Sequence, residues 1–387
     1  KVMTALLALE LGDLDAPVTC SRNAFGVPGT SIYLSEGETL TLREMLYGLM
    51  LASGNDAATA IAEHIGGTKA DFADMMNKRA EALGCVNTHF MNPHGLDEDN
   101  HYTCPLDLAL LTRPLVKNST FVKISGSKNH KIPATNLCAE DRWILNTHLM
   151  IRGTYTYDGV IAGKTGHTDL AGANLVTCAK RGNMTLIAVI MKAPDDTALY
   201  NDTTTLLNYG FDNFATYSVS DEQLSLSNDV PPLFNGEDTI QLTRKNIITT
   251  DSGTVVLPSS ASLSDITKSV QLTQLTDFAE GKNLIGKVTY TYGSRTVGIA
   301  NIIYNNKGPA FTISPDDSAE STEQNEGVPA TDGQEKTENS SKKERMPLII
   351  GIILGCICFL IGVYFIFVEL PYRRKRSAYL KKKNKRF

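Results

Sequence analysis

The first part of the chain carries apolar residues at helical spacing. Thr41 to Glu44 is a capping-box pattern that opens an apolar run, and further helices are predicted over Ala57 to Ile65 and Asp71 to Leu83. The helix from Ala57 is expected to stop at Gly66-Gly67, and the helix from Asp71 at Gly84. The latter helix has its large apolar residues on one face, namely Phe72, Met75, Met76, Ala80 and Leu83.

Further along, the hydrophobic period changes from helical to strand-like. Gly172 to Lys180 and Met184 to Lys192 indicate two strands, joined by the turn residues Arg181-Gly182-Asn183. A closing helix is predicted from Ala198 to Tyr209. Residues 1–216 are therefore expected to form a mixed α/β (α+β) domain with an antiparallel sheet.

From residue 217 onward, short alternating runs are broken by Gly, Asn and Asp. Examples are Thr239 to Leu242, Lys287 to Tyr292 and Thr296 to Tyr304. This pattern predicts a small β-sandwich over residues 217–313. No candidate catalytic cluster stands out in that stretch.

The last part of the sequence predicts a membrane anchor. Residues 314–346 are polar and cannot bury enough apolar surface to fold, so a disordered linker is expected. Residues 347–368 carry no charge and are long enough to cross a hydrocarbon core of about 30 Å as one transmembrane helix. The basic tail, 369–387, includes Arg373 to Arg376. The positive-inside rule then predicts a cytoplasmic tail and an extracytoplasmic catalytic domain on a single-pass cell-membrane protein.

Composition removes some classes of function. A net charge of −5 over 387 residues gives no support for a nucleic-acid binder. The seven cysteines include no C-x-x-C pair, so neither a zinc ribbon nor a thioredoxin-like site is predicted, and free, mostly buried thiols are expected. The sequence opens on Lys1 without an apolar signal segment, which indicates either a removed signal peptide or a fragment.

Three short elements carry the candidate chemistry: Lys1 to Glu10, Ser53 to Ala58 and Val160 to Asp169. A serine hydroxyl becomes a good nucleophile only when a base accepts its proton. A lysine can be that base when neutral, and a second ammonium nearby lowers its pKa by repulsion. Lys1 and Lys164 would be such a pair.

The other polar residues of these elements suit the handling of a peptide. Ser53, at the end of a helix, can relay a proton to a leaving amine, and Asn55 can offer its amide to a substrate peptide group. Lys164 and Thr165, on a strand edge, can hold a carboxylate. Glycines such as Gly166 permit a close approach to the backbone there.

Together and in this order, the elements resemble the S-x-x-K, S-x-N and K-T-G set of the serine penicillin-binding proteins and β-lactamases. The neighbouring segments narrow the resemblance to the low-molecular-mass D-alanyl-D-alanine carboxypeptidases. Asn92 to Leu96 with His101 to Thr103 resembles that family's N-P-H-G-L…H-Y-T segment, and Leu206 to Phe211 resembles its closing helix. The resemblance is dense from Lys1 to about Phe214 and looser beyond it.

The resemblance implies a penicillin-binding, β-lactamase-like transpeptidase fold and a serine-type hydrolase that removes the terminal D-Ala of peptidoglycan stem peptides. Its nucleophilic Ser would lie three residues before Lys1 and is absent from the chain, which by itself would then be inactive. Lys1 would be the base, and Ser53 and Asn55 would assist. The N–H of His167 would form part of the oxyanion hole.

The same resemblance assigns the binding of the substrate's terminal carboxylate to Lys164, Thr165 and Gly166. Because a β-lactam carboxylate can occupy the same place, β-lactams would be covalent inhibitors of the complete enzyme. The partners implied are peptidoglycan stem peptides and, through the C-terminal helix, the membrane. No metal, cofactor or nucleic acid is expected.

Some alternatives stay open. Two internal S-x-x-K matches, Ser125 to Lys128 and Ser340 to Lys343, are expected to be chance. A class A β-lactamase would carry Glu-x-x-Leu-Asn, but Arg142 stands at the Glu position before Leu145-Asn146. An endopeptidase acting on cross-links differs only in substrate. A non-catalytic wall-binding or penicillin-sensing membrane protein is the alternative from another class, and the residues upstream of Lys1 would discriminate it.

Overall fold

The structure is a computed structural model that describes residues 1–220, 247–249, 253–273, 275, 277–306 and 308–312. The predicted linker at 314–346, the predicted membrane span at 347–368 and the basic tail at 369–387 lie outside the described residues. The strand-like run Thr239 to Leu242 and the match Ser340 to Lys343 lie outside them too. No helix of the described part is long and apolar enough to cross a membrane.

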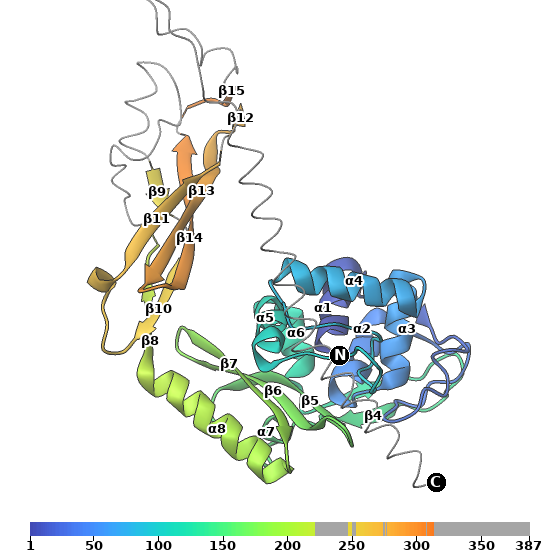
Figure 1. The fold of residues 1–387 in the computed structure, drawn as a ribbon. Coiled ribbons are helices and arrows are strands. Elements are labelled where there is room, and N and C mark those ends of the chain that lie inside the picture. The colour runs from blue at the N-terminus through green and yellow to red at the C-terminus, as the bar shows by residue number, and fades with distance from the viewer. Residues whose placement is uncertain (221–246, 250–252, 274, 276, 307, 313–387) are drawn as a thin grey trace, which may run out of the picture. The chain divides into compact units, whose positions relative to one another are not determined.

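A group of helices forms the first layer of the N-terminal part (Figure 1). These are α1 (Val2–Leu11), α2 (Leu42–Leu51), α3 (Asn55–Gly66), α4 (Lys69–Ala82), α5 (Pro105–Val116) and α6 (Ser119–Ser125). Helix α1 is buried around most of its circumference and contacts α2, α3, α4 and α5. Its predominantly apolar sequence suits a central helix, because the helix packs against four others.

The helix ends follow local signals in the sequence. Thr41 caps α2 by accepting a hydrogen bond from the N–H of Glu44, which is the N-cap half of the predicted capping box, while the Glu44 carboxylate bonds to His130. The glycines predicted to end α3 and α4 include two in the left-handed region, Gly67 at φ 77° and Gly84 at φ 80°. Both helices begin two residues earlier than predicted, and α4 does so because Thr68 is its N-cap.

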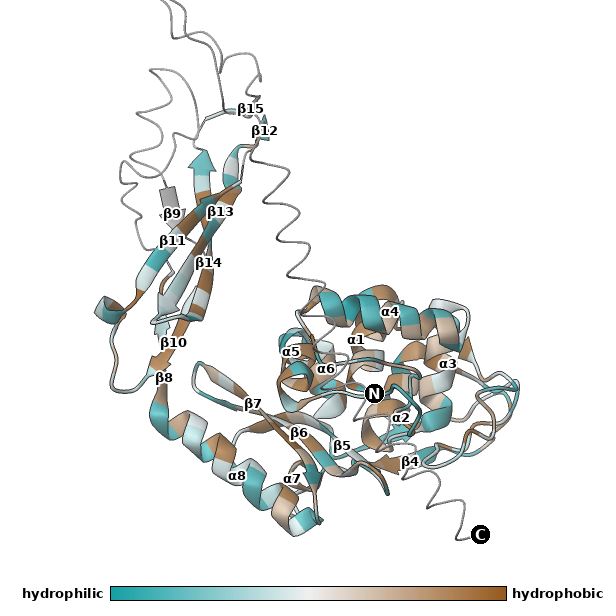
Figure 2. Ribbon diagram, in the orientation of Figure 1, coloured by the Kyte–Doolittle hydropathy of each residue, from teal (hydrophilic) through white to brown (hydrophobic). Residues whose placement is uncertain are grey.

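A three-stranded antiparallel sheet forms the second layer, in the order β5-β6-β7. Its strands are β5 (Val160–Thr168), β6 (Gly172–Arg181) and β7 (Met184–Ala193). The predicted hairpin between β6 and β7 is confirmed. Helix α8 (Asp196–Asn213) packs on β6 and β7, and Figure 2 shows the alternation of teal and brown residues along it. Helices α5 and α6 contact the same sheet from the helical layer.

Short elements connect the two layers. They are β1 (Pro17–Thr19), β2 (Thr39–Thr41), β3 (Asn129–Ile132), β4 (Arg142–Leu145) and the single turn α7 (Leu149–Arg152). Strands β1 and β2 form one antiparallel ribbon, and β3 and β4 form another. The residues between β4 and α7 run beside the middle of β5, where the hydroxyl of Thr147 lies 2.7 Å from that of Thr165, and this brings them to the pocket described below.

The remaining described residues form β-structure. Its strands are β8 (Phe214–Ser218), β9 (Ile247–Thr249), β10 (Thr254–Pro258), β11 (Thr267–Leu272), β12 (Asp277–Phe278), β13 (Gly281–Tyr292), β14 (Arg295–Asn306) and β15 (Phe311–Thr312). Four of them form the sheet β11-β13-β14-β9, while β8 pairs with β10 and β12 with β15. Apolar residues of β10, such as Val255 and Leu257, share a core with Val288 and Ile302 of the four-stranded sheet. The predicted runs at Lys287 and Thr296 are confirmed as strands.

The described cysteines are all free thiols, as expected. Cys20, Cys85 and Cys178 are buried, and Cys104 and Cys138 are partly buried. The other two cysteines of the sequence, Cys356 and Cys358, lie outside the described residues.

Candidate active site

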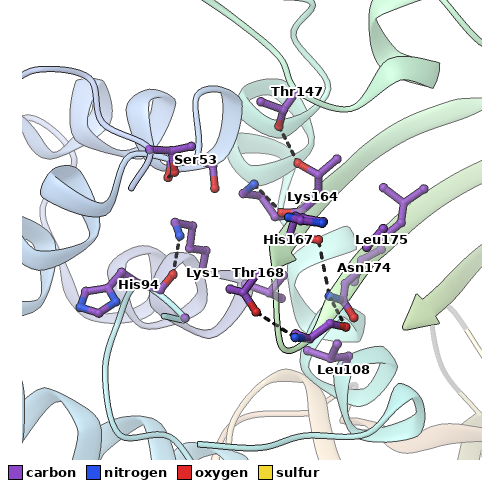
Figure 3. Close-up of a pocket in the computed structure, with 18 of the residues that line it drawn as sticks. Lys1, Ser53, His94, Leu108, Thr147, Lys164, His167, Thr168, Asn174 and Leu175 are labelled. Atoms are coloured by element: carbon purple, nitrogen blue, oxygen red, sulfur yellow. Dashed lines mark hydrogen bonds between the residues drawn. The ribbon is translucent and has the colours of Figure 1, made fainter. Parts of the chain in front are cut away.

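One pocket of about 760 Å³ brings the three sequence elements together. Figure 3 shows Lys1 on its helical side and Lys164 on the side of β5. All the site residues predicted from the sequence line it: Lys1, Ser53, Asn55, Lys164, Thr165, Gly166 and His167. Residues separated by more than 160 positions in the chain therefore meet in one space.

Lys1 precedes α1 and points its ammonium into the pocket. Its Nζ donates a hydrogen bond to the carbonyl oxygen of His94, drawn as a dashed line in Figure 3. Burial lowers the pKa of Lys1 to about 8, and the nearby carboxylate of Asp56 opposes that shift. An amine with this pKa is neutral in a useful fraction of molecules near neutral pH, so it can accept a proton.

The segment Asn92 to Leu96 presents the carbonyl group that Lys1 contacts. The side chain of Asn92 accepts a hydrogen bond from Gly95 N–H at 2.7 Å and donates one to the carbonyl oxygen of Leu96 at 3.0 Å. Thr4 of α1 donates to the carbonyl oxygen of Pro93 at 2.6 Å. The turn is therefore closed on itself and tied to the helix that follows Lys1.

The two histidines in this region bond to nearby backbone groups. His94 Nδ1 accepts from Leu96 N–H at 3.3 Å, and His101 Nδ1 accepts from Met91 N–H at 3.0 Å. Burial lowers the pKa of both imidazoles to about 4, and the charge of Lys1 adds to this shift at His94. Both rings are thus neutral acceptors for local backbone groups.

Ser53 follows the end of α2 in a backbone conformation that side-chain-bearing residues rarely adopt, with φ 59°. The hydroxyl of Thr30 donates to the Ser53 carbonyl oxygen at 2.6 Å and holds this turn. The side chain of Ser53 is partly buried and lines the pocket. Strained conformations of this kind persist where the surrounding structure fixes them, and they are frequent at active sites.

Asn55 is the first residue of α3. Its Nδ2 donates to the carbonyl oxygen of Pro28 at 2.6 Å, which fixes the amide plane. Its Oδ1 is buried and has no hydrogen-bond partner among the described residues. A buried carbonyl oxygen without a partner is uncommon, and Asn55 is one of the residues that line the pocket.

Strand β5 supplies the other wall of the pocket. Lys164 is only 6% exposed, and its Nζ donates to the carbonyl oxygen of Thr165 at 2.8 Å. Burial is the largest cause that lowers the pKa of Lys164 well below its ordinary value, and the charge of Lys1 is the second. Repulsion thus acts on Lys164, whereas the prediction had it lower the pKa of Lys1. The pKa of the Lys1 side chain is lowered by burial instead, because the amine is withdrawn from water.

Two lysines and one carboxylate, that of Asp196, line the pocket. Within the described ranges, neither Lys1 nor Lys164 forms an ion pair with a carboxylate. The carboxylate of Asp56, the acidic group that acts on Lys1, accepts hydrogen bonds from Ser31 and from the N–H groups of Ile32 and Leu34. The pocket is thus suited to an anionic ligand.

The backbone N–H and C=O groups of β5 point alternately toward β6 and toward the open edge of the strand. The N–H and C=O of Gly163 both bond to the hydroxyl of Ser125, at 2.9 and 2.7 Å, and so face away from β6. In an antiparallel ladder this orientation recurs at every second residue, which includes Thr165 and His167. The N–H of His167 is therefore directed to the open edge of the strand, and His167 lines the pocket.

Comparison with known proteins identifies the family. The family model for the S11 peptidases, described as D-alanyl-D-alanine carboxypeptidase, matches residues 1–195. The chain belongs to the S11 family.

Curated relatives agree with this assignment. D-alanyl-D-alanine carboxypeptidase DacF of Bacillus subtilis is 36% identical over 222 residues, which is 56% of each chain. D-alanyl-D-alanine carboxypeptidase DacA of Haemophilus influenzae is 34% identical over 230 residues, again 56% of each. The chain thus spans little more than half the length of these relatives.

Solved structures show the same fold. Penicillin-binding protein 5 from Haemophilus influenzae matches with a TM-score of 0.58 at 26% identity, over 80% of this chain and 88% of that one. The DD-transpeptidase of Streptomyces K15 matches with a TM-score of 0.51 at 32% identity, over 55% of this chain and 86% of that one. This S11 chain therefore has the penicillin-binding, transpeptidase-like fold, with mixed helices and sheet.

Ser125 of this S11 chain, which begins an internal S-x-x-K match, has a structural role. Ser125 is fully buried, and its hydroxyl is engaged by the backbone of Gly163. Arg142, noted at the position of a β-lactamase glutamate, forms an ion pair with the buried Glu38. Neither residue is among those that line the pocket.

Sequence reasoning missed the segment Asn146-Thr147-His148 of this S11 chain. Thr147 lines the pocket and its hydroxyl lies 2.7 Å from that of Thr165. The ring of His148 lies beneath β5, and burial lowers its pKa to about 3. These residues follow a four-residue strand and carry no motif, so no signal in the sequence pointed to them.

Proposed function

We propose that this chain is the main part of a serine-type D-alanyl-D-alanine carboxypeptidase that removes the terminal D-Ala from peptidoglycan stem peptides. The observation that carries the proposal is the convergence of Lys1, Ser53, Asn55, Lys164 and Thr165 on one pocket. Membership of the S11 family supports the same reaction. The nucleophile is a Ser three residues before Lys1, in the S-x-x-K spacing, which lies one helical turn away.

Lys1 acts as the general base. With its pKa lowered to about 8 by burial, it accepts the proton of the nucleophilic hydroxyl as that oxygen attacks the carbonyl of the penultimate D-alanine. Ser53 relays the proton to the departing amine, and the free Oδ1 of Asn55 accepts a substrate N–H. The N–H of His167, directed to the open edge of β5, stabilises the oxyanion.

Lys164, Thr165 and Gly166 bind the terminal carboxylate of the substrate. Lys164 supplies positive charge, Thr165 supplies a hydroxyl, and Gly166 leaves room beside the strand, since even an added Cβ atom there would meet no atom closer than 3.7 Å. β-Lactams carry an equivalent carboxylate and so acylate the same serine. Water then releases the shortened peptide and restores the enzyme.

The domain order proposed for the chain follows the sequence. A catalytic domain at 1–216 and a β-rich module at 217–313 stand outside the cell membrane on the linker 314–346. Residues 347–368 anchor the protein as one transmembrane helix, and the tail 369–387 is cytoplasmic. The uniform apolarity of 347–368 and the basic residues that follow support this arrangement.

The release of free D-alanine tests the proposed reaction. The full protein with its native upstream residues is incubated with a tripeptide that ends in D-Ala-D-Ala, and with the L-Ala-L-Ala peptide as control. D-alanine is expected from the first peptide alone, and Lys1→Ala and Ser53→Ala should each abolish most of the release. No release by the parent protein would contradict the carboxypeptidase proposal, and cleavage of cross-linked peptides instead would favour an endopeptidase.

A further inference from the structure

Thr147 contributes a second hydroxyl to the wall of the pocket at β5. Its Oγ1 lies 2.7 Å from Oγ1 of Thr165, and Figure 3 shows this hydrogen bond as a dashed line. Both residues are partly buried and both line the pocket. In the part of the chain that the structure describes, neither hydroxyl has another hydrogen-bond partner.

The backbone of Thr147 is fixed on both sides, so its hydroxyl has a defined position. The N–H of Thr147 donates to the carbonyl oxygen of Leu51, near the end of α2, at 3.0 Å. The side chain of the preceding Asn146 donates to the carbonyl oxygen of Ser125 at 2.8 Å and accepts from the N–H of His148 at 2.9 Å. Thr147 thereby joins the segment that leads to Ser53 with the strand that carries Lys164.

A count of protons shows what the two hydroxyls can offer. Each hydroxyl has one proton, and one of the two protons is used in the bond between Thr147 and Thr165. The other proton is left for a ligand, whichever hydroxyl donates internally. A hydrogen bond to a charged acceptor is about twice as strong as one between neutral groups, so the pair favours an anion.

We propose that Thr147 is a specificity-determining residue that binds the carboxylate of the substrate together with Thr165. This inference rests on the proposed function, because it names a further group in its carboxylate subsite. The neighbouring amine of Lys164, without an ion-pair partner in the described ranges, attracts the same anion. The Thr147 hydroxyl orients the bound carboxylate.

A pair of ligands that differ in one charge tests this role. Benzylpenicillin and its methyl ester are reacted with the full protein, native upstream residues included, and the acylation rate constants are measured by intact mass. Thr147→Val is expected to slow acylation by the free acid roughly tenfold or more, while the ester changes by less than about twofold. Thr147→Ser should restore the preference for the acid.

A matched control comes from another pair of threonines. The hydroxyls of Thr19 and Thr39 lie 2.9 Å apart at an exposed position on the ribbon β1–β2, and neither residue lines the pocket. Thr19→Val removes the same atom from the same kind of pair and should leave both rate constants unchanged. The acid-to-ester ratio is measured on one preparation, so the fraction of folded protein cancels from it.

The outcomes separate this inference from the proposed function. An unchanged acid-to-ester ratio in Thr147→Val, whether both rates fall together or neither changes, overturns the role of Thr147 and leaves the proposed function intact. The absence of any penicillin adduct on the parent protein overturns the proposed function, and the role of Thr147 with it.

Discussion

At the scale of single residues, two lysines, Lys1 partly buried and Lys164 buried, determine what the pocket can do. Lys1 bonds to the carbonyl oxygen of His94, and Lys164 bonds to that of Thr165. Neutral carbonyl groups hold the amines in place without balancing their charge, and burial then lowers both pKa values. One such amine can serve as a base while the other attracts an anionic substrate.

The lowered pKa of Lys1 predicts the pH dependence of acylation. Because the neutral amine is the base, the rate of reaction with benzylpenicillin should rise with pH through the pKa of about 8 and then level off. The measurement is the acylation rate constant over a pH series that spans this value. Lys1→Arg, which stays protonated throughout, should give no such rise. A rate independent of pH would contradict the role of Lys1 as base.

The same shift has a consequence for stability. The pKa of Lys1 is about 8 in the folded protein, against an ordinary value of 10.5. Between these values the unfolded chain binds more protons than the folded one, so the free energy of unfolding should rise with pH in this window. Lys164 acts in the same direction, since burial lowers its pKa as well. Urea denaturation of the parent protein and of Lys1→Met, compared across the window, checks this slope.

At the scale of elements, strand β5 depends on two close contacts. A Cβ atom on Gly163 would lie 2.5 Å from Cδ2 of His148 and 2.5 Å from the carbonyl oxygen of Val176. Gly163→Ala should therefore lower the free energy of unfolding by about 1–3 kcal/mol. Gly166→Ala is the matched control, because the nearest atom is 3.7 Å away. Equal stabilities of the two variants in urea denaturation would show that the packing at Gly163 has been misjudged.

The second contact is the hydroxyl of Ser125, which bonds both backbone groups of Gly163. Ser125→Ala leaves these buried groups unpaired and should cost about 1–3 kcal/mol of stability. The matched control is Ser127→Ala, since the hydroxyl of Ser127 donates to the carbonyl oxygen of Lys123 at an exposed position. Thermal unfolding of both variants measures the difference, and a loss no larger at Ser125 than at Ser127 would contradict the role of Ser125 in anchoring β5.

The sequence predicted these elements where a local signal exists. The positive φ angles of Gly67 and Gly84 favour residues without a side chain, so the two glycines identified the helix ends. The S-x-N and K-T-G residues were predicted because their order forms a motif. Thr147 was not predictable, because its role depends on the path of the chain after β4. The same holds for Ser125, whose partner Gly163 lies 38 residues away.

At the scale of the whole molecule, the proposed membrane anchor predicts where the protein is found in the cell. Residues 347–368 are predicted to hold the protein in the cell membrane. Removal of residues 347–387 should move the protein from the membrane fraction to the soluble fraction. Retention of the shortened protein by membranes washed in high salt would contradict an anchor at this position, and deletion of the tail 377–387 alone serves as the control.

The reaction with benzylpenicillin tests the central proposal most directly. The full protein with its native upstream residues is incubated with benzylpenicillin, and its intact mass is measured beside that of the chain that starts at Lys1. A single penicilloyl adduct is expected on the first protein and none on the second, with the modified peptide containing the Ser three residues before Lys1. The absence of an adduct on both proteins would contradict an acyl-enzyme mechanism and favour a non-catalytic wall-binding protein.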